Sequence, residues 1–272
     1  MNLTMNRNPY KFFIITYIWT WGLLAIPIIF NLNYSNIITK MSFYIAGAAP
    51  SAVALILVFS SKDKEYIKSF FNRLINFRLI NLKSYIFIFT FIPTANIVAT
   101  SIYSAIWNVS FNFNPSINNL FDILMFAFFM LLFGPLAEEL GWRGYALDKL
   151  TNKYNIIKSC LLISVFWALW HAPMFLINGT YQNSIAHQSW LLIVDFFIAI
   201  IANSFIMTII YIKNNKSILS GILYHFNINF FGELFDLNNS EMFLRTLIQV
   251  VISIILIGVL IKKDQLYDKK TA

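Results

Sequence analysis

Two adjacent carboxylates, Glu138 and Glu139, stand in a strongly apolar part of the sequence, and Arg143 follows them. On a helix, Glu139 and Arg143 lie four residues apart on one face, where they can form an ion pair. Glu138 is rotated by about 100° from Glu139, because an α-helix has 3.6 residues per turn. We therefore predict that Arg143 neutralises Glu139 and holds the helix. Glu138 then keeps its lone pairs for a water molecule, as a general base requires.

A helix cap is the alternative explanation for this pair of carboxylates. It would hold if the helix ended near residue 138, at the cytoplasmic end of a membrane span. The apolar pattern continues through Trp142, Tyr145 and Leu147. That continuation favours a longer helix with the carboxylates inside it.

Three further polar residues lie in apolar stretches: His171, His225 and Asn229. His171 stands among tryptophans shortly before Pro173, which can open the helical backbone locally. A single histidine on an apolar helix is more often a core residue, so this signal is weak alone. His225 and Asn229 share a helical face and can both donate hydrogen bonds. They could stabilise an oxyanion, or they could clasp two membrane helices together.

The composition indicates the elements that must position these residues. Of the 272 residues, 58% are hydrophobic and only 12% are charged, whereas soluble domains are about one quarter charged. A membrane-spanning helix needs about 20 apolar residues. We therefore predict an all-α, polytopic membrane protein: a single transmembrane domain over 1–272, with its motif-bearing core at about 119–236. The eight predicted spans are 11–30, 42–60, 85–107, 119–148, 156–177, 190–212, 216–236 and 243–262.

The distribution of basic residues predicts how these spans are oriented in the membrane. With eight spans, 18 of the 20 lysines and arginines fall on the side of both termini, and only Lys40 and Arg245 fall on the other. The positive-inside rule then places both termini in the cytoplasm of a cell-membrane protein. The net charge of +8 is explained by this topology, so we expect the lipid bilayer and no nucleic acid as a partner.

The basic segment 61–84 connects two predicted spans on the cytoplasmic side. Ile67, Phe70, Phe71 and Leu74 follow the i, i+3, i+4, i+7 spacing of one helical face. This spacing predicts an amphipathic helix that lies on the cytoplasmic leaflet. A solvated basic connector is the alternative, which the aromatic residues disfavour.

The depths of the candidate residues are compatible with one site. A helical residue rises about 1.5 Å, which places Glu138 about 15 Å, His225 about 13 Å and His171 about 22 Å from the cytoplasmic helix ends. All three could therefore meet near the middle of the membrane.

Together these motifs resemble the CPBP family of CAAX-processing and bacteriocin-processing enzymes, also called the Abi family. The set is Glu-Glu-x-x-x-Arg at 138–143, an aromatic-x-x-x-His ending at His171, and His-x-x-x-Asn at 225–229. The chain looks like a prokaryotic relative of the type II CAAX prenyl endopeptidase. Trp167 stands where the family pattern usually has phenylalanine, so an aromatic residue is kept.

The resemblance implies a role for each residue. Glu138 and His171 would activate a water, His225 and Asn229 would bind the oxyanion, and Glu139 and Arg143 would orient the site. The family has been called a metalloprotease family, and Glu138, His171 and His225 could form a His₂Glu zinc set. No His-Glu-x-x-His motif supplies two ligands from one helical turn, so metal-free catalysis, without a cofactor, is preferred.

These patterns favour a membrane-embedded endopeptidase that cuts a hydrophobic, bacteriocin-like or prenylated substrate near the cytoplasmic face. One alternative is a non-catalytic immunity or scaffold protein, in which the polar residues only hold helices together. A second is a proton-coupled transporter, since intramembrane glutamate and histidine also build proton relays. The sequence has no internal repeat of the kind that many transporters share.

Overall fold

The computed structural model describes residues 8–112, 115, 117 and 119–271, with side chains as far as residue 260. These residues form a bundle of helices, which confirms the all-α prediction. Arg7, which the topology prediction used, lies outside the described residues. The helices are α1 (Pro9–Ile29), α2 (Ile37–Gly47), α3 (Ala49–Phe59), α4 (Lys64–Ile75), α5 (Leu82–Trp107), α6 (Leu120–Leu131), α7 (Ala137–Glu139), α8 (Asp148–Lys153), α9 (Ile156–Trp170), α10 (Tyr181–Gln188), α11 (Trp190–Lys213), α12 (Ile218–Leu234) and α13 (Asn239–Thr271).

The protein is a multi-pass membrane protein, but the predicted count of eight spans is not confirmed. Among the described residues, six helices are long and apolar enough to cross a membrane. Helices α2 and α3, bent by 42° at their junction, raise the number to seven if they form one span. The predicted seventh span corresponds to α12, which has 17 residues and is shorter than a typical span of about 20.

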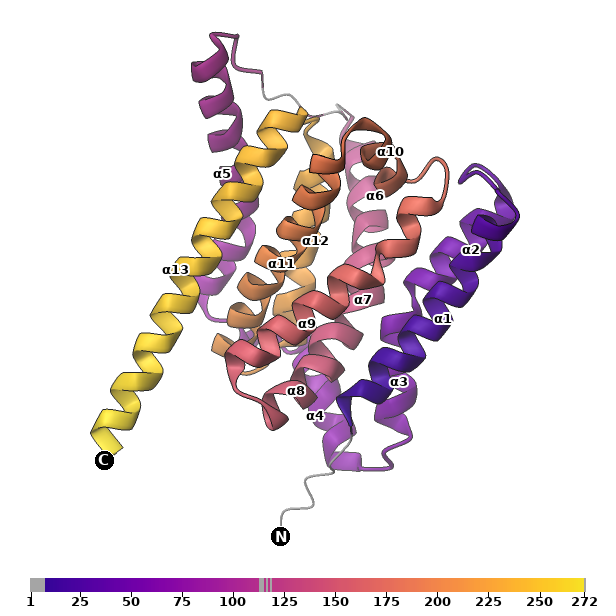
Figure 1. The fold of residues 1–272 in the computed structure, drawn as a ribbon. Coiled ribbons are helices and arrows are strands. Elements are labelled where there is room, and N and C mark those ends of the chain that lie inside the picture. The colour runs from indigo at the N-terminus through magenta and orange to yellow at the C-terminus, as the bar shows by residue number, and fades with distance from the viewer. Residues whose placement is uncertain (1–7, 113–114, 116, 118, 272) are drawn as a thin grey trace.

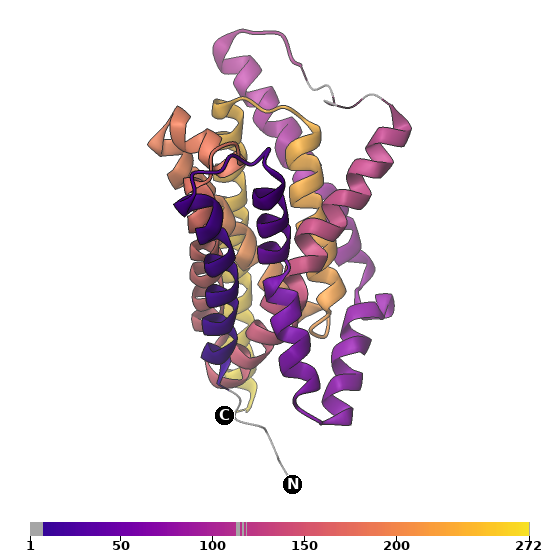
Figure 2. The ribbon, with the colours of Figure 1, turned by 90° about the vertical axis from the view of Figure 1, so that its right-hand side faces the viewer.

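The helices cross the bundle in alternating directions (Figure 1). Helices α1, α5, α9 and α12 run one way, and α2–α3, α6–α8, α11 and α13 return. The start of α1 and the end of α13 therefore lie at the same end of the bundle, together with α4 and α8. Helix α10 lies at the opposite end. Figure 2 shows that α6 diverges from α2 toward the end that carries residue 120.

The paired carboxylates lie inside a long helical segment, Leu120–Lys153, of 34 residues. Two π-helical stretches, η2 (Leu132–Leu136) and η3 (Leu140–Leu147), flank the short α7 that carries both glutamates. Pro135 lies in the first stretch, where a widened turn accommodates a residue that cannot donate the normal helical hydrogen bond. Because the helix continues beyond residue 138, the helix-cap explanation is wrong.

Close packing against α3 fixes the segment that follows the carboxylates. Gly141 lies against the backbone carbonyl of Pro50, so closely that a Cβ atom on Gly141 would collide with it. Ser51 of α3 donates a hydrogen bond to the backbone oxygen of Leu136 at 2.9 Å. These two contacts with α3 fix the residues just before and just after α7.

The basic segment between α3 and α5 contains the predicted amphipathic helix, α4. Its position differs from the prediction, because part of its apolar face packs on protein. Phe70 is completely buried, against Gly144. Arg73 is also buried: it donates to the Tyr211 hydroxyl at 2.7 Å and lies 3.6 Å from Asp148. Sequence spacing identifies an apolar face, but it does not say whether lipid or protein covers that face.

Candidate active site

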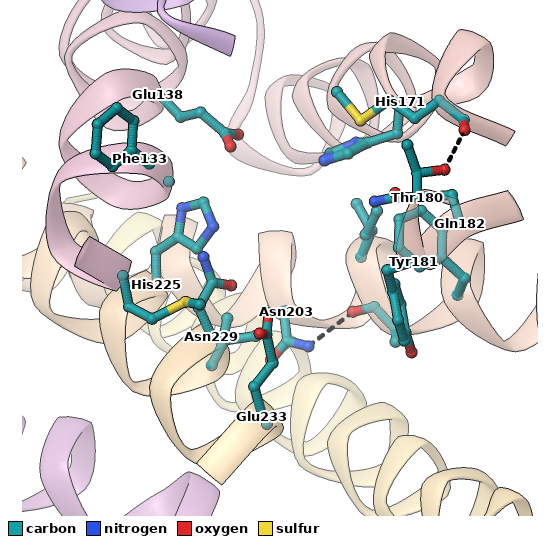
Figure 3. Close-up of a pocket in the computed structure, with 18 of the residues that line it drawn as sticks. Phe133, Glu138, His171, Thr180, Tyr181, Gln182, Asn203, His225, Asn229 and Glu233 are labelled. Carbon is teal, nitrogen blue, oxygen red and sulfur yellow. Dashed lines mark hydrogen bonds between the residues drawn. The ribbon is translucent and has the colours of Figure 1, made fainter. Parts of the chain in front are cut away.

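The predicted site residues surround one cavity of about 720 Å³. Glu138, His171, His225 and Asn229 line it, and they come from α7, the end of α9 and α12. Figure 3 shows the Glu138 carboxylate and the His171 ring pointing toward each other, with His225 beside them. Glu139 and Arg143 lie behind this surface, both with no exposed area.

Glu139 is the centre of a buried polar network. Its Oε1 atom accepts a hydrogen bond from Nη1 of Arg143 at 3.0 Å, which confirms the predicted ion pair. The same oxygen lies 2.8 Å from Nδ1 of His225 on α12. Helical spacing does not predict this second contact, because 86 residues separate the two side chains. Glu139 thus joins the helix of the carboxylates to the helix of His225 and Asn229.

Arg143 is held on three sides. Besides Glu139, its guanidinium donates to the Ser204 hydroxyl at 3.1 Å. The Trp167 ring lies over the guanidinium, with 4.4 Å between its carbon and the ring centroid, a distance at which cation–π attraction is effective. The fixed cation balances the charge of Glu139 where no water is available to do so.

Glu138 has a different environment, on the wall of the cavity. Its Oε2 atom accepts a hydrogen bond from the indole Nε1 of Trp167 at 2.7 Å. No salt bridge or further hydrogen bond engages the Glu138 carboxylate among the described residues. One oxygen is therefore anchored, and the other is available to a molecule in the cavity.

Trp167 contacts three of the predicted site residues, Glu138, His171 and Arg143. The sequence pattern predicts only an aromatic replacement for phenylalanine here, yet the indole N–H makes a contact with Glu138 that phenylalanine cannot make. Its backbone oxygen contacts the His171 ring, and its own ring lies over the Arg143 guanidinium. The departure from the family pattern was itself the signal that could have identified it.

The end of α9 determines which nitrogen of His171 faces the cavity. The last turn tightens, and the backbone N–H of His171 donates to Ala168. The carbonyl of Trp167 instead lies 2.9 Å from Nδ1 of the His171 ring. A carbonyl only accepts hydrogen bonds, so Nδ1 carries the proton. In the neutral ring Nε2 then has a free lone pair.

His225 is oriented in a similar way. Its Nδ1 atom donates to the Glu139 carboxylate, which leaves Nε2 for the cavity. Asn229 lies one turn further along α12 and approaches Gly134 of η2 closely. A Cβ atom on Gly134 would lie 2.5 Å from Nδ2 of Asn229, so only glycine leaves room for this amide. The predicted shared face of His225 and Asn229 thus points into the cavity.

The side chains do not form a metal-binding cluster. Within the described part of the chain, no three histidine, cysteine, aspartate or glutamate side chains are arranged so that they could hold a metal ion. Glu138, His171 and His225 share the cavity without forming such a set.

The cavity extends from these residues to the end of the bundle opposite the chain termini. Tyr34, Tyr181, Glu233 and Asp236 line that part, close to the beginning of α10 and the end of α12 (Figure 1). Burial raises the pKa of the Tyr34 and Tyr181 hydroxyls, so both stay neutral near pH 7. We call this part of the cavity the mouth. Its lining is polar, whereas Phe129, Phe133 and other aromatic side chains line the walls of the cavity.

Comparison with known proteins agrees with the geometry. The family model described as "Type II CAAX prenyl endopeptidase Rce1-like" matches residues 120–231, the segment that contains all six predicted site residues. The chain is also 34% identical to CAAX prenyl protease 2 from Methanococcus maripaludis over 270 residues. That alignment covers 97% of this chain and 95% of the archaeal protein.

Proposed function

Because this chain belongs to the family of type II CAAX prenyl endopeptidases, we propose that it hydrolyses a peptide bond in a prenylated CAAX-type peptide within the membrane. One observation carries this proposal. Glu138, His171 and His225 line one cavity, and both histidines have their Nδ1 atoms engaged by the protein. Two Nε2 atoms and one carboxylate oxygen are therefore left for substrate and water.

Glu138 acts as the general base. Its free oxygen takes a proton from a water molecule while the water oxygen attacks the peptide carbonyl carbon. Nε2 of His171 accepts the second hydrogen bond of that water and so orients it. The C–N bond then breaks, and Glu138 returns the proton to the leaving amine. The hydrogen bond from Trp167 keeps the carboxylate in position through both transfers.

His225 and Asn229 stabilise the negative charge that develops on the carbonyl oxygen. The Asn229 amide and a protonated His225 Nε2 would both donate to this oxygen. Glu139 supports this role, because its contact with Nδ1 fixes the ring so that Nε2 faces the cavity. Arg143 in turn fixes Glu139 through the ion pair. These two residues position the site without touching the substrate.

The cavity suits a lipid-modified peptide. Its volume of about 720 Å³ lies in the range of small-molecule pockets. Aromatic side chains of α2 and α6 line one wall, among them Tyr44, whose ring centroid lies 4.8 Å from that of Phe133. Such a wall favours an isoprenoid chain, whereas the polar atoms gather around Glu138 and the mouth.

The test is cleavage of an internally quenched prenylated peptide by the purified protein, with and without a strong zinc chelator. We expect cleavage that survives the chelator. Glu138→Gln and His171→Ala should abolish it while the protein still inserts and melts normally. Asp122→Asn is the matched control, because Asp122 is an exposed carboxylate of α6 away from the cavity.

Three results would contradict the proposal. Full activity in Glu138→Gln would remove the general base from the mechanism. Loss of activity on chelation, restored by zinc, would replace the metal-free reaction with a metal-dependent one. If no peptide is cleaved and Glu138→Gln still produces the biological effect of the protein, a binding role would replace catalysis.

A further inference from the structure

A second polar region lies in the same cavity, away from Glu138. Arg245 of α13 lines it, and Gln249 follows one turn later. Among the described residues, the Arg245 guanidinium donates no hydrogen bond and has no carboxylate within 4.0 Å. Its Nε atom is buried without a partner, as is Oε1 of Gln249. Arg245 is therefore a cation that faces the cavity with its donors unused.

The nearby acids form no salt bridge with Arg245 among the described residues, although Asp195 is close enough to attract it electrostatically. Asp195 of α11 instead accepts a hydrogen bond from Thr246 at 3.1 Å. Glu241 accepts from the backbone N–H of Asn238 at 2.8 Å. Glu233 also lines the cavity, but it forms no ion pair with Arg245. An unpaired guanidinium within a membrane domain is costly, so an anionic group that enters the cavity would bind there favourably.

The position of Arg245 relative to the candidate active site limits the size of that ligand. A Cβ atom on Gly232 would lie 3.6 Å from Nη1 of Arg245, so the guanidinium lies beside Gly232 of α12. Gly232 comes seven residues after His225 on the same helix, which corresponds to about 10 Å along its axis. An extended peptide of three residues also spans about 10 Å.

We propose that Arg245 binds the terminal carboxylate of the substrate, three residues beyond the peptide bond that is cut. The proposal rests on the proposed function, since three residues follow the cysteine in a CAAX sequence. A planar guanidinium suits this ligand because it can donate two parallel hydrogen bonds to a carboxylate. The protein then cuts at a fixed distance from the C-terminus of the substrate, and it selects peptides with a free C-terminal carboxylate.

The experiment compares two prenylated peptides of identical sequence, one ending in a free carboxylate and one in an amide. The wild-type protein should cleave the free acid with a kcat/KM about 10- to 100-fold higher, mainly through KM, as expected for a charge-assisted bidentate contact. Arg245→Gln should bring the two peptides to the same kcat/KM. Arg245→Lys should restore part of the difference, because it keeps the charge and loses the planar fork.

Lys40→Gln is the matched control. It also removes one positive charge at the mouth end of the bundle, but Lys40 is exposed and does not line the cavity. This variant should keep the wild-type preference for the free acid. Equal cleavage of both peptides by the wild type, or a preserved preference in Arg245→Gln, would overturn the assignment.

A binding measurement separates this proposal from the proposed function. Glu138→Gln should bind the free acid more tightly than the amide, and the double variant Glu138→Gln/Arg245→Gln should bind both alike. Fluorescence anisotropy of labelled prenyl peptides reports this without any cleavage. Absence of cleavage together with the acid preference would contradict catalysis alone, and cleavage without the preference would contradict the role of Arg245 alone.

Discussion

Arg143 and Arg245 are two inward-facing arginines of one membrane bundle. In both, the Nε atom is buried without a hydrogen-bond partner, but the groups around the rest of the guanidinium differ. Arg143 has no exposed area, an ion pair, a hydroxyl acceptor and an aromatic ring over its guanidinium. Arg245 borders the cavity with no hydrogen-bond partner among the described residues. A charge balanced within the protein holds other side chains in place. A charge left unbalanced beside a cavity is available to a ligand.

The largest difference between the two arginines should appear in stability. Arg143→Met leaves Glu139 buried without its arginine, with His225 as its remaining partner, which should lower the free energy of unfolding by about 3–5 kcal/mol. Arg245→Met removes a cation that has no partner, so stability should stay within about 1 kcal/mol or rise. Thermal melting of both variants in the same detergent measures this contrast. Equal destabilisation by the two substitutions would show that Arg245 has a structural partner after all.

The second test concerns Asn229, which lies on α12 between His225 and the region of Arg245. Gly134→Ala places a methyl group where the Asn229 amide now lies and should reduce kcat about 100-fold, as the loss of one oxyanion donor does. Gly22→Ala is the control, because nothing lies within 4 Å of the added carbon. Normal turnover in Gly134→Ala would exclude Asn229 as an oxyanion donor.

A smaller effect is expected at Trp167, which connects the Arg143 side of the site to Glu138. Trp167→Phe keeps a ring for the guanidinium but removes the N–H that holds the Glu138 carboxylate. We expect kcat to fall about 10-fold, the equivalent of one hydrogen bond to a charged group, with melting little changed. Trp107→Phe, at the exposed end of α5, should leave kcat as it is. A tenfold change in KM instead of kcat would place Trp167 in substrate binding.

The smallest effect should come from Ser204, the hydroxyl partner of Arg143. Ser204→Ala removes one hydrogen bond and leaves the ion pair with Glu139 intact. The expected loss is about 1 kcal/mol of unfolding free energy. Ser101→Ala, an exposed serine of α5 that bonds only its own helix, provides the reference value. A loss as large as that of Arg143→Met would mean that the hydroxyl, and not the carboxylate, holds the guanidinium.

Local spacing predicted the parts of the site that depend on one helix. The Glu139–Arg143 pair and the shared face of His225 and Asn229 follow from the geometry of a helical turn. The contact between Glu139 and His225 joins two helices, and no periodicity within either helix specifies it. The same limit applies to Arg73 of α4, whose partner Tyr211 lies 138 residues away.

Arg245 illustrates a different limit of sequence reasoning. Counting basic residues placed it with Lys40 on the side opposite the termini, as one charge in a topology argument. Its place on the cavity depends on how α13 packs against α11 and α12, which the charge pattern does not encode. The π-helical turns around Glu138 were also outside prediction, because Pro135 signals an interruption of the helix without specifying its form.

The cavity mouth and the two chain ends lie at opposite ends of the bundle (Figure 1). Under the proposed function, a peptide that enters through this mouth comes from the compartment opposite the one that contains the termini. If the positive-inside prediction holds, cytoplasmic termini would place the mouth on the outer face, opposite to the cytoplasmic cleavage that the sequence favoured. Sealed vesicles of known orientation, carrying a protease-sensitive tag on the C-terminus, would show which face has the tag and which admits the peptide.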